Sequence, residues 1–329
     1  MSTIKVAIVG ASGETGQSII NGLLKSSQDF TITALVRSAS IDKPEVQQIK
    51  AKGVNIAPFE LESSHEEQVK ALAGQDVVIC CIIPQSADLS NALADAAKAG
   101  GVKRFVPSFF GPVAPAYGVM ALREIKEDVL NHIKEINLPY TIIDVGWWYQ
   151  NTLPRLPSGK IDYAVKFPLD KVYGDGNLPT AVTDLRDIGT YVARIIADPR
   201  TLNAAVFAYN EIQTQEQILS LLESLSGESV PREYLSIPDL EAAIATAQAT
   251  YDQDRSWMKL LGVAILQYPN STFVRGDNLP GPAAKLGYMS GKELYPDVQV
   301  TKYADYVAEV VAGKGKAVYA NRTFGFETK

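Results

Sequence analysis

The stretch IKVAIV at Ile4–Val9 runs directly into GASGETG at residues 10–16, and SIINGLLKS follows at residues 18–26. The apolar, β-branched first run predicts a buried parallel strand, the glycines predict a tight turn, and the last run predicts a helix. Such a turn exposes backbone N–H groups at the positive end of a helix dipole, where pyrophosphate binds. Glycine turns also occur where nothing binds, but strand, turn and helix together favour a dinucleotide site. The predicted contacts from this turn are Gly10, Ser12, Gly13, Glu14, Thr15 and Gly16.

The end of the second predicted strand indicates which dinucleotide binds. The run TITALV at residues 31–36 leads to Arg37 and Ser38, about 21 residues after the last glycine. In NAD-selective folds an acidic residue near this point binds the ribose 2′-hydroxyl, whereas a guanidinium beside a hydroxyl suits a 2′-phosphate. The sequence therefore predicts NADPH or NADP+, with Lys43 as a second positive contact. The alternative is that Arg37 is simply an exposed residue after a strand.

Length and composition are typical of an enzyme with a large core. The chain has 329 residues, 46% of them hydrophobic and 21% charged, which favours two domains. Its net charge of −6 argues against direct binding of nucleic acid. No apolar run approaches the roughly 20 residues of a membrane span, and the first residues enter a core strand without room for a signal peptide. We therefore expect a cytoplasmic protein without a membrane contact.

The few cysteines and histidines argue against a metal site. Cys80 and Cys81 are neighbours in the predicted strand DVVICCII, so we expect reduced core residues rather than a disulfide or a metal pair. His65 and His132 are the only histidines. We therefore predict no bound metal.

Strands alternate with helical segments from residue 4 to about residue 145, which predicts βαβ units. The predicted fold class is α/β: a Rossmann-type doubly wound parallel sheet with a second, smaller α+β substrate domain. The predicted cofactor domain covers residues 1–155, and residues of about 180–225 return to it. Residues 156–329 mainly form the interleaved substrate domain. Within them we expect helices at 185–197 and 215–226, a helical subdomain at 231–262, and a final strand and helix at 296–312.

Several motifs resemble the isoflavone reductase-like group of atypical short-chain dehydrogenases, close to the NmrA-like proteins and especially those of fungi. GASGETG is similar to the GxTGxxG turn of that family, LVRS to the strand end with its NADP-selecting arginine, and AGGVKRFVPSFFGP to AGVKRFxPSEFG. GNLPTAVTDLRDIGTYVARIIADPRTLN and ELYPDVQVTKYADYV resemble two later signatures, so the resemblance runs nearly end to end. It implies a Rossmann-type domain, a smaller substrate domain, NADPH, and reduction of small aromatic or conjugated secondary metabolites.

The resemblance also implies an active-site lysine. In the family this lysine precedes the proline of an IPYT-like strand entry by thirteen residues, and Lys126 stands thirteen residues before Pro139 in LPYT. On the predicted helix Lys126 lies one turn from Leu122 and Leu130, beside the apolar stripe. Lost hydration would lower its pKa and make it usable as an acid or base. The alternative is that its stem packs on the core while the ammonium reaches water.

The chain departs from the family where PSEFG becomes PSFFG. Phe109 replaces an acidic residue, which either removes a polar contact near the cofactor or reshapes the substrate wall. Ser108 at the strand end is a candidate hydrogen-bond donor to the cofactor, although such a hydroxyl is often only a local cap. Ile83 and Pro84, after the fourth predicted strand, and Lys126 itself complete the predicted cofactor contacts.

Aromatic residues are the candidates for the substrate wall, because their faces offer a planar substrate large, stiff contact areas. The alternative for the adjacent tryptophans is core packing between domains. A Tyr-x-x-x-Lys motif also occurs at Tyr288 and Lys292, but about one is expected by chance and it lies far beyond the predicted sheet, so we reject it. The predicted substrate contacts are Phe110, Tyr117, Trp147, Trp148 and Tyr149.

Together these features predict an NADPH-dependent oxidoreductase. It would pass hydride to an enone, quinone methide, carbonyl or imine of a small-molecule substrate, with Lys126 as acid or base. The alternative is an NmrA-like regulator that senses NADP without turning it over. We expect a monomer or a homodimer.

Overall fold

The computed structural model describes residues 3–82 and 87–320, and its centre is a parallel sheet whose first five strands run in the order β3-β2-β1-β4-β5. β1 pairs with β2 on one side and β4 on the other, both in parallel. The bounds are β1 (Ile4–Val9), β2 (Phe30–Val36), β3 (Asn55–Pro58), β4 (Val77–Cys80) and β5 (Arg104–Val106). This order, with β1 between β2 and β4, is that of a dinucleotide-binding half-sheet.

Three later strands extend the sheet beyond β5. A bridge between Phe105 and Tyr140 connects β5 to this group, whose order is β13-β10-β6 with parallel pairing. The bounds are β6 (Thr141–Asp144), β10 (Ala204–Phe207) and β13 (Tyr288–Ser290). The strand predicted within residues 296–312 is wrong, because residues 296–302 are irregular. The last strand of the chain is instead β13, which lies just before this segment in the sequence and pairs with β10 at the edge of the sheet.

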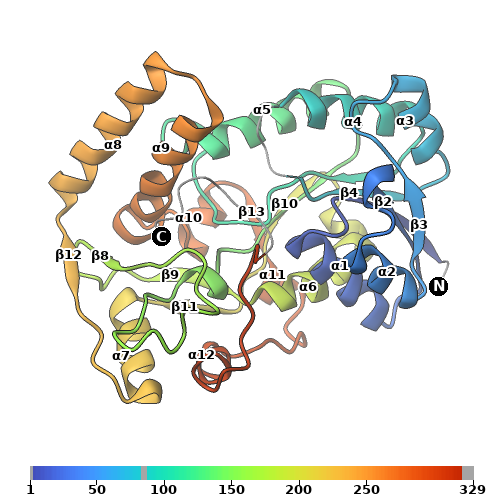
Figure 1. Cartoon of the computed structure of the whole chain (residues 1–329). Helices are drawn as coiled ribbons and strands as arrows, with labels where there is room; N and C mark the ends of the chain where they lie inside the picture. The colour runs from blue at the N-terminus through green and yellow to red at the C-terminus, as the bar shows by residue number, and fades with distance from the viewer. Residues whose placement is uncertain (1–2, 83–86, 321–329) are drawn as a thin grey trace.

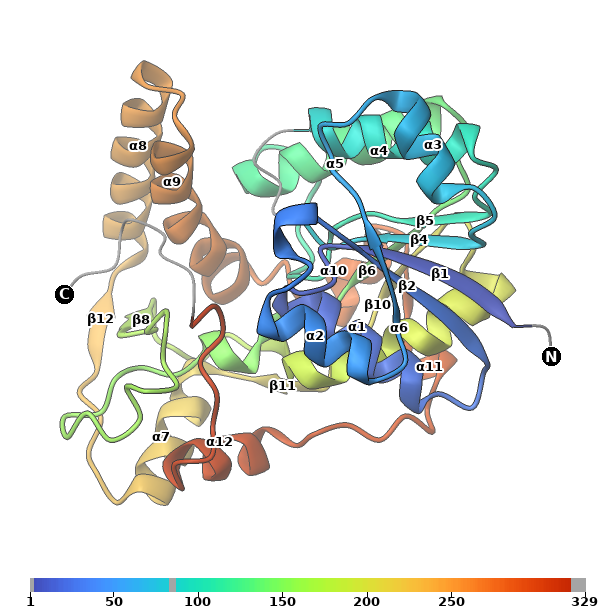
Figure 2. The same cartoon turned by 45° about the vertical axis from the view of Figure 1, so that its right-hand side comes forward.

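Helices cover both faces of the sheet (Figures 1 and 2). One face carries α1, α2, α6 and α11, and the other carries α3, α4 and α5. The fold is therefore the predicted Rossmann-type doubly wound sheet. The bounds are α1 (Glu14–Lys25), α2 (Pro44–Ala51), α3 (His65–Leu72), α4 (Asp88–Ala99), α5 (Ala121–Glu135), α6 (Ile188–Ala197) and α11 (Gly291–Leu294).

A close crossing of α1 and α6 brings residues 188–207 back to the first domain. The Ser18 hydroxyl donates to the Leu185 carbonyl at 2.6 Å and accepts from the Gly189 N–H at 3.1 Å. A Cβ atom at Gly22 would lie 2.0 Å from the carbonyl carbon of Gly189, and one at Gly189 would lie 1.9 Å from the Ser18 carbonyl oxygen. Both glycines are therefore required by the contact between the two backbones.

Gly189→Ala should lower the free energy of unfolding by about 2 kcal/mol or more, because the two helices must separate to admit the methyl group. Urea denaturation monitored by circular dichroism measures the change. The matched control is Gly262→Ala in the middle of α9, where a Cβ atom would meet nothing within 4 Å. That change should leave stability unaltered or raise it by up to about 1 kcal/mol. Equal effects of the two substitutions would contradict the close crossing.

The second lobe consists of small sheets and peripheral helices (Figure 1). One sheet has the order β11-β9-β7, β12 pairs with β8, and α8 and α9 form a helical pair. The strands of this lobe are β7 (Trp147–Trp148), β8 (Lys171–Tyr173), β9 (Thr180–Thr183), β11 (Glu211–Gln213) and β12 (Glu233–Leu235). The helices of this lobe are α7 (Gln215–Ser226), α8 (Ile237–Gln253), α9 (Trp257–Pro269) and α12 (Tyr303–Val311). α10 (Pro280–Lys285) lies beside β13 of the main sheet.

Short helical segments connect these elements. They are the 3₁₀ turns Ser38–Ser40, Tyr149–Asn151, Leu185–Asp187 and Pro199–Thr201 and the π-helical Asn270–Arg275. Cys80 is buried and Cys81 partly buried, and both are free thiols. None of the helices within residues 3–82 and 87–320 is long and apolar enough to cross a membrane.

Candidate active site

A cavity of about 630 Å³ lies between the sheet and the second lobe, within the usual size of a ligand site. It opens at the carboxyl ends of β1, β4 and β5, where doubly wound folds bind ligands. Among the predicted site residues, those that line it are Gly13, Glu14, Thr15, Ser108, Phe109, Phe110, Lys126, Trp147 and Trp148. Two distant parts of the sequence, the glycine turn and α5, therefore meet at one cavity.

The three glycines of the turn have different structural roles. Gly10 has a φ of +79°, and a Cβ atom there would lie 2.5 Å from the Cys81 carbonyl oxygen. A Cβ atom at Gly16 would lie 2.4 Å from the Gly10 carbonyl oxygen. Gly13, the N-cap of α1, has an ordinary φ of −74° and lines the cavity. The backbone angles at position 13 do not require glycine, so we interpret the missing side chain as leaving space for a ligand in front of the helix.

The predicted ribose contacts lie beside this turn. Because β1 and β2 pair in parallel with Val9 opposite Leu35, Arg37 follows β2 close to the start of the turn. Arg37, Ser38 and Lys43 are all exposed. The Ser38 N–H donates to the Glu60 carboxylate at 2.8 Å, a contact from the end of β3 that our sequence analysis missed. Ile83 and Pro84 lie outside the described residues.

Lys126 is held on α5 with its ammonium beside the cavity. Its Nζ donates to the Phe109 carbonyl at 2.6 Å. Burial lowers the pKa of Lys126 from its usual 10.5 to about 8, and the charge of Asp144 partly opposes this shift. The lysine is therefore mostly charged at neutral pH and loses its proton just above it.

Phe109, where the family has an acid, packs between two cations of α5. Its ring is 3% exposed, with the Arg123 guanidinium 4.7 Å and the Lys126 Nζ 5.8 Å from its centroid. Arg123 is fixed in turn by Asp144, 2.7 Å away. An aromatic face rather than a counter-charge thus lies beside Lys126, and the Phe109 carbonyl orients the ammonium.

The loop that carries Phe109 is strained at the next residue. Phe110 has a φ of +37°, a conformation that costs on the order of 1–3 kcal/mol and persists only when its surroundings fix it. Its N–H donates to the Ile143 carbonyl at 2.9 Å, and its own carbonyl accepts from the Trp148 indole at 3.0 Å. These bonds hold the loop in the position that aims the Phe109 carbonyl at Lys126.

Two predicted substrate contacts lie away from the cavity. Tyr117 is 50% exposed, and its hydroxyl donates to Asp128 at 2.9 Å. Tyr149 is fully buried, and its ring packs edge-on against Tyr303 at 4.8 Å. Neither is among the lining residues. The run Trp147, Trp148, Tyr149 therefore divides between the cavity wall and the core of the second lobe.

The rejected Tyr-x-x-x-Lys motif is not assembled at the cavity. The Tyr288 hydroxyl donates to Asp144 and accepts from Arg123, each at 2.6 Å. The Lys292 ammonium lies 4.8 Å from the centroid of the Tyr209 ring. Tyr288 has a structural role in the sheet, which supports its rejection as a catalytic residue.

Several lining residues were missed by sequence analysis. The largest group belongs to α9, which falls partly within the predicted helical subdomain, but sequence periodicity did not indicate which surface this helix would cover. Others come from the loop before β8, from the loops after β4 and β5, and from the last described residues. The missed aromatic and apolar residues include Trp257, Leu261, Ile265, Tyr268, Phe167 and Tyr319.

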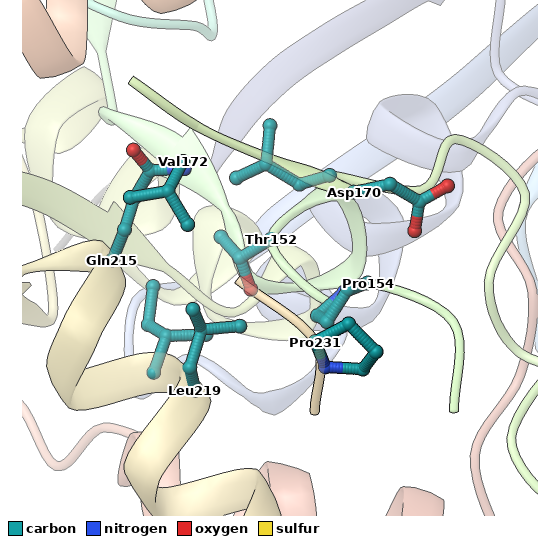
Figure 3. A pocket seen from close by; sticks show the side chains of 9 residues that line it. Thr152, Pro154, Asp170, Val172, Gln215, Leu219 and Pro231 are labelled. Atoms are coloured by element: carbon teal, nitrogen blue, oxygen red, sulfur yellow. The ribbon is translucent and has the colours of Figure 1, made fainter. Parts of the chain in front are cut away.

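A second hollow in the other lobe is far smaller (Figure 3). At about 10 Å³ it has room for one water molecule at most. Side chains from β8, α7 and the loops beside them surround it: Thr152, Pro154, Asp170, Val172, Gln215, Leu219 and Pro231. A ligand-sized site is therefore found at the large cavity rather than here.

Comparisons with known proteins agree with this geometry. The NmrA-like family pattern matches residues 2–255. A similar protein, the asnovolin J 5′,6′-dehydrogenase nvfM of Aspergillus novofumigatus, is 46% identical over 315 residues, covering 94% of this chain and 96% of that protein.

Solved structures show the same architecture. An isoflavone reductase crystal structure is 25% identical with a TM-score of 0.76, covering 94% of this chain and 99% of that one. A leucoanthocyanidin reductase–NADPH complex from Vitis vinifera is 23% identical with a TM-score of 0.75 and the same coverage. The chain therefore belongs to the NmrA-like family and, within it, to the isoflavone reductase-like oxidoreductases.

Proposed function

We propose that this protein is an NADPH-dependent reductase of a small conjugated or aromatic secondary metabolite. One observation carries the proposal: Lys126, with a pKa of about 8, lines the same cavity as the open N-terminus of α1. The names of the relatives support it, since isoflavone reductase and leucoanthocyanidin reductase share this fold and the latter was crystallised with NADPH. The direct assay is NADPH oxidation with a panel of conjugated aromatic ketones, quinone methide precursors and cyclic imines.

The glycine turn fits a dinucleotide phosphate. Gly13 leaves the space before α1 free of a side chain, and the first N–H groups of a helix have no partner within it. The Glu14 carboxylate accepts from the Tyr319 N–H at 2.9 Å, so we expect Glu14 to meet the phosphate through its backbone N–H. The other proposed cofactor contacts are Gly10, Ser12, Thr15, Gly16, Arg37, Ser38, Lys43, Ile83, Pro84, Ser108 and Phe109.

Lys126 is the proposed proton-handling group. When bound, the nicotinamide supplies hydride to an electrophilic carbon of the substrate. Negative charge then develops on the oxygen or nitrogen that is bonded to that carbon or conjugated with it, and the Lys126 Nζ stabilises and protonates that atom. Phe109 and the strained Phe110 keep Nζ in place. Phe110, Trp147 and Trp148 form the proposed substrate wall, while Tyr117 and Tyr149 would have to act from outside the cavity.

The same site would support the reverse reaction, which is a second candidate function. The relative at 46% identity is named a dehydrogenase, so it is described by removal of hydrogen rather than its addition. In that direction Lys126 must start neutral and accept a proton, whereas in reduction it must start charged. Assays with NADP+ and with NADPH, run at equal protein concentration, separate the two directions.

Cofactor choice is a direct prediction of this proposal. NADPH should bind at least about tenfold more tightly than NADH, a difference of roughly 1.4 kcal/mol that one phosphate contact can supply. Arg37→Asp should remove the preference, because it replaces the cation with a charge that repels the 2′-phosphate. Isothermal titration calorimetry measures both affinities.

The control for this prediction is Arg255→Asp, which makes the same charge change at an exposed position between α8 and α9. It should leave the preference for NADPH intact. Equal affinities of the wild type for the two cofactors, or unchanged NADPH binding by Arg37→Asp, would refute the assignment of Arg37.

A further inference from the structure

The segment after α12, residues 312–320, runs back along the boundary between the two lobes (Figure 2), and its Tyr319 lines the cavity. Its Gly315 N–H donates to the Tyr163 hydroxyl at 2.9 Å. Val318 is 2% exposed and packs in the core that also contains β1 and α6. The Tyr319 N–H then donates to the Glu14 carboxylate at the start of α1. The segment is therefore docked on both the second lobe and the glycine turn.

Docking places the Tyr319 ring in an aromatic corner of the cavity. The ring is stacked on Trp148, with 6.2 Å between centroids and 29° between planes. It also meets Phe167 edge-on at 6.2 Å. All three side chains line the cavity. Because the rings already contact one another, a ligand would pack on the corner rather than between them.

The corner is connected to the loop that carries Phe109 and Phe110. The Trp148 indole N–H donates to the Phe110 carbonyl, and the preceding Phe109 carbonyl holds Lys126. The strained φ of Phe110 shows that this part of the chain is fixed by its surroundings. A ring held against the corner would therefore have a defined position relative to the Lys126 ammonium.

We propose that Tyr319 is a specificity-determining residue, which with Trp148 and Phe167 binds the face of a planar conjugated ring of the substrate. The proposal rests on the function proposed above and deepens it, because it names the chemical class of substrate that the cavity selects. Aromatic side chains lose little conformational entropy when a flat ligand covers them, and their contacts are strongest with another π-system. The segment of residues 312–320 would thus form part of the substrate site.

The test measures binding without turnover. The probe is 8-anilinonaphthalene-1-sulfonate, a flat naphthalene whose fluorescence rises in apolar sites, titrated by direct excitation with saturating NADP+ present. Tyr319→Ala should weaken its binding by about tenfold, and Trp148→Ala should have a similar effect, because both remove part of the corner. Tyr319→Phe keeps the ring and should stay within about twofold of the wild type.

Two controls separate this proposal from the proposed function and from unfolding. Tyr234→Ala removes an exposed tyrosine on β12, outside the lining residues, and should leave probe binding unchanged. Tyr319→Ala loses the ring contacts but retains Val318 and the backbone N–H, so it should still unfold in one cooperative transition, as the wild type does. NADPH affinity should stay within about threefold in every variant.

The possible failures are distinct. No probe binding by the wild type, unchanged binding by Tyr319→Ala, or unchanged binding by Trp148→Ala would each overturn the aromatic corner as a ring site. A wild-type protein that does not bind NADPH would instead overturn the proposed function.

Discussion

Lys126→Ala is expected to reduce turnover by about a hundredfold or more while NADPH affinity changes by no more than a few-fold. The substitution removes the group that protonates the substrate, but it leaves the glycine turn and Arg37 in place. Steady-state kinetics with a substrate identified in the panel, together with calorimetry of NADPH, measure the two effects. Lys126→Arg should not restore activity, because a guanidinium stays protonated near neutral pH.

The matched control is Lys134→Ala, which removes an exposed lysine two turns further along α5. It should retain wild-type turnover. If activity survives in Lys126→Ala, the protein is still an enzyme of this family, but the proposed role of Lys126 is wrong.

The pH dependence of kcat should show whether Lys126 donates or accepts the proton. Burial penalises the charged ammonium, so Lys126 holds its proton below a pKa of about 8 and loses it above. In reduction Lys126 donates a proton, so kcat should be level below pH 8 and fall as the pH rises through it. In dehydrogenation Lys126 accepts a proton, and kcat should instead rise through the same range. Either dependence should disappear in Lys126→Ala.

Gly13→Val is expected to weaken NADPH binding by at least about a hundredfold, or about 2.8 kcal/mol. A branched side chain would occupy the space before α1 that the phosphate needs. Folding should be retained, because Gly13 has an ordinary φ of −74° at the cavity surface. Calorimetry with NADPH and thermal unfolding of the same sample measure the two properties.

Gly16→Val provides the contrast. A side chain there would meet the Gly10 carbonyl oxygen at 2.4 Å, so this variant should lose folding stability as well as binding. Normal NADPH binding by Gly13→Val would show that the turn is not the phosphate site.

The features that were predicted best from the sequence are those that a local sequence pattern determines. The expected first strand coincides with β1, and the expected helix at 215–226 coincides with α7, whose ends carry a Thr214 capping box and Gly227 in the left-handed conformation. Lys126 could be selected because it lies beside the apolar stripe of its helix, and because the resemblance to the family implies an active-site lysine at this offset from Pro139. Such signals lie within a few turns of chain and do not depend on distant packing.

What escaped prediction depends on contacts between distant segments. β13 has only three residues and forms by pairing with β10, more than eighty residues earlier. Tyr149 and Trp148 are adjacent, yet one faces the core and the other the cavity, because Trp148 bonds to the Phe110 carbonyl. Tyr319 reaches the glycine turn across almost the whole chain. No periodicity encodes these placements.

The most direct test of the central claim follows a single hydrogen. Two stereoisomers of NADPH, each deuterated at C4, are incubated separately with the wild-type protein and the substrate panel or host extracts. The masses of the products are then measured by mass spectrometry. We expect one isomer to yield a product that carries one deuterium, and the yield to fall about a hundredfold in Lys126→Ala. The account would be contradicted if the wild-type protein binds NADPH tightly but transfers deuterium to none of these compounds. Co-purification of a regulatory protein with it would then support the NADP sensor instead.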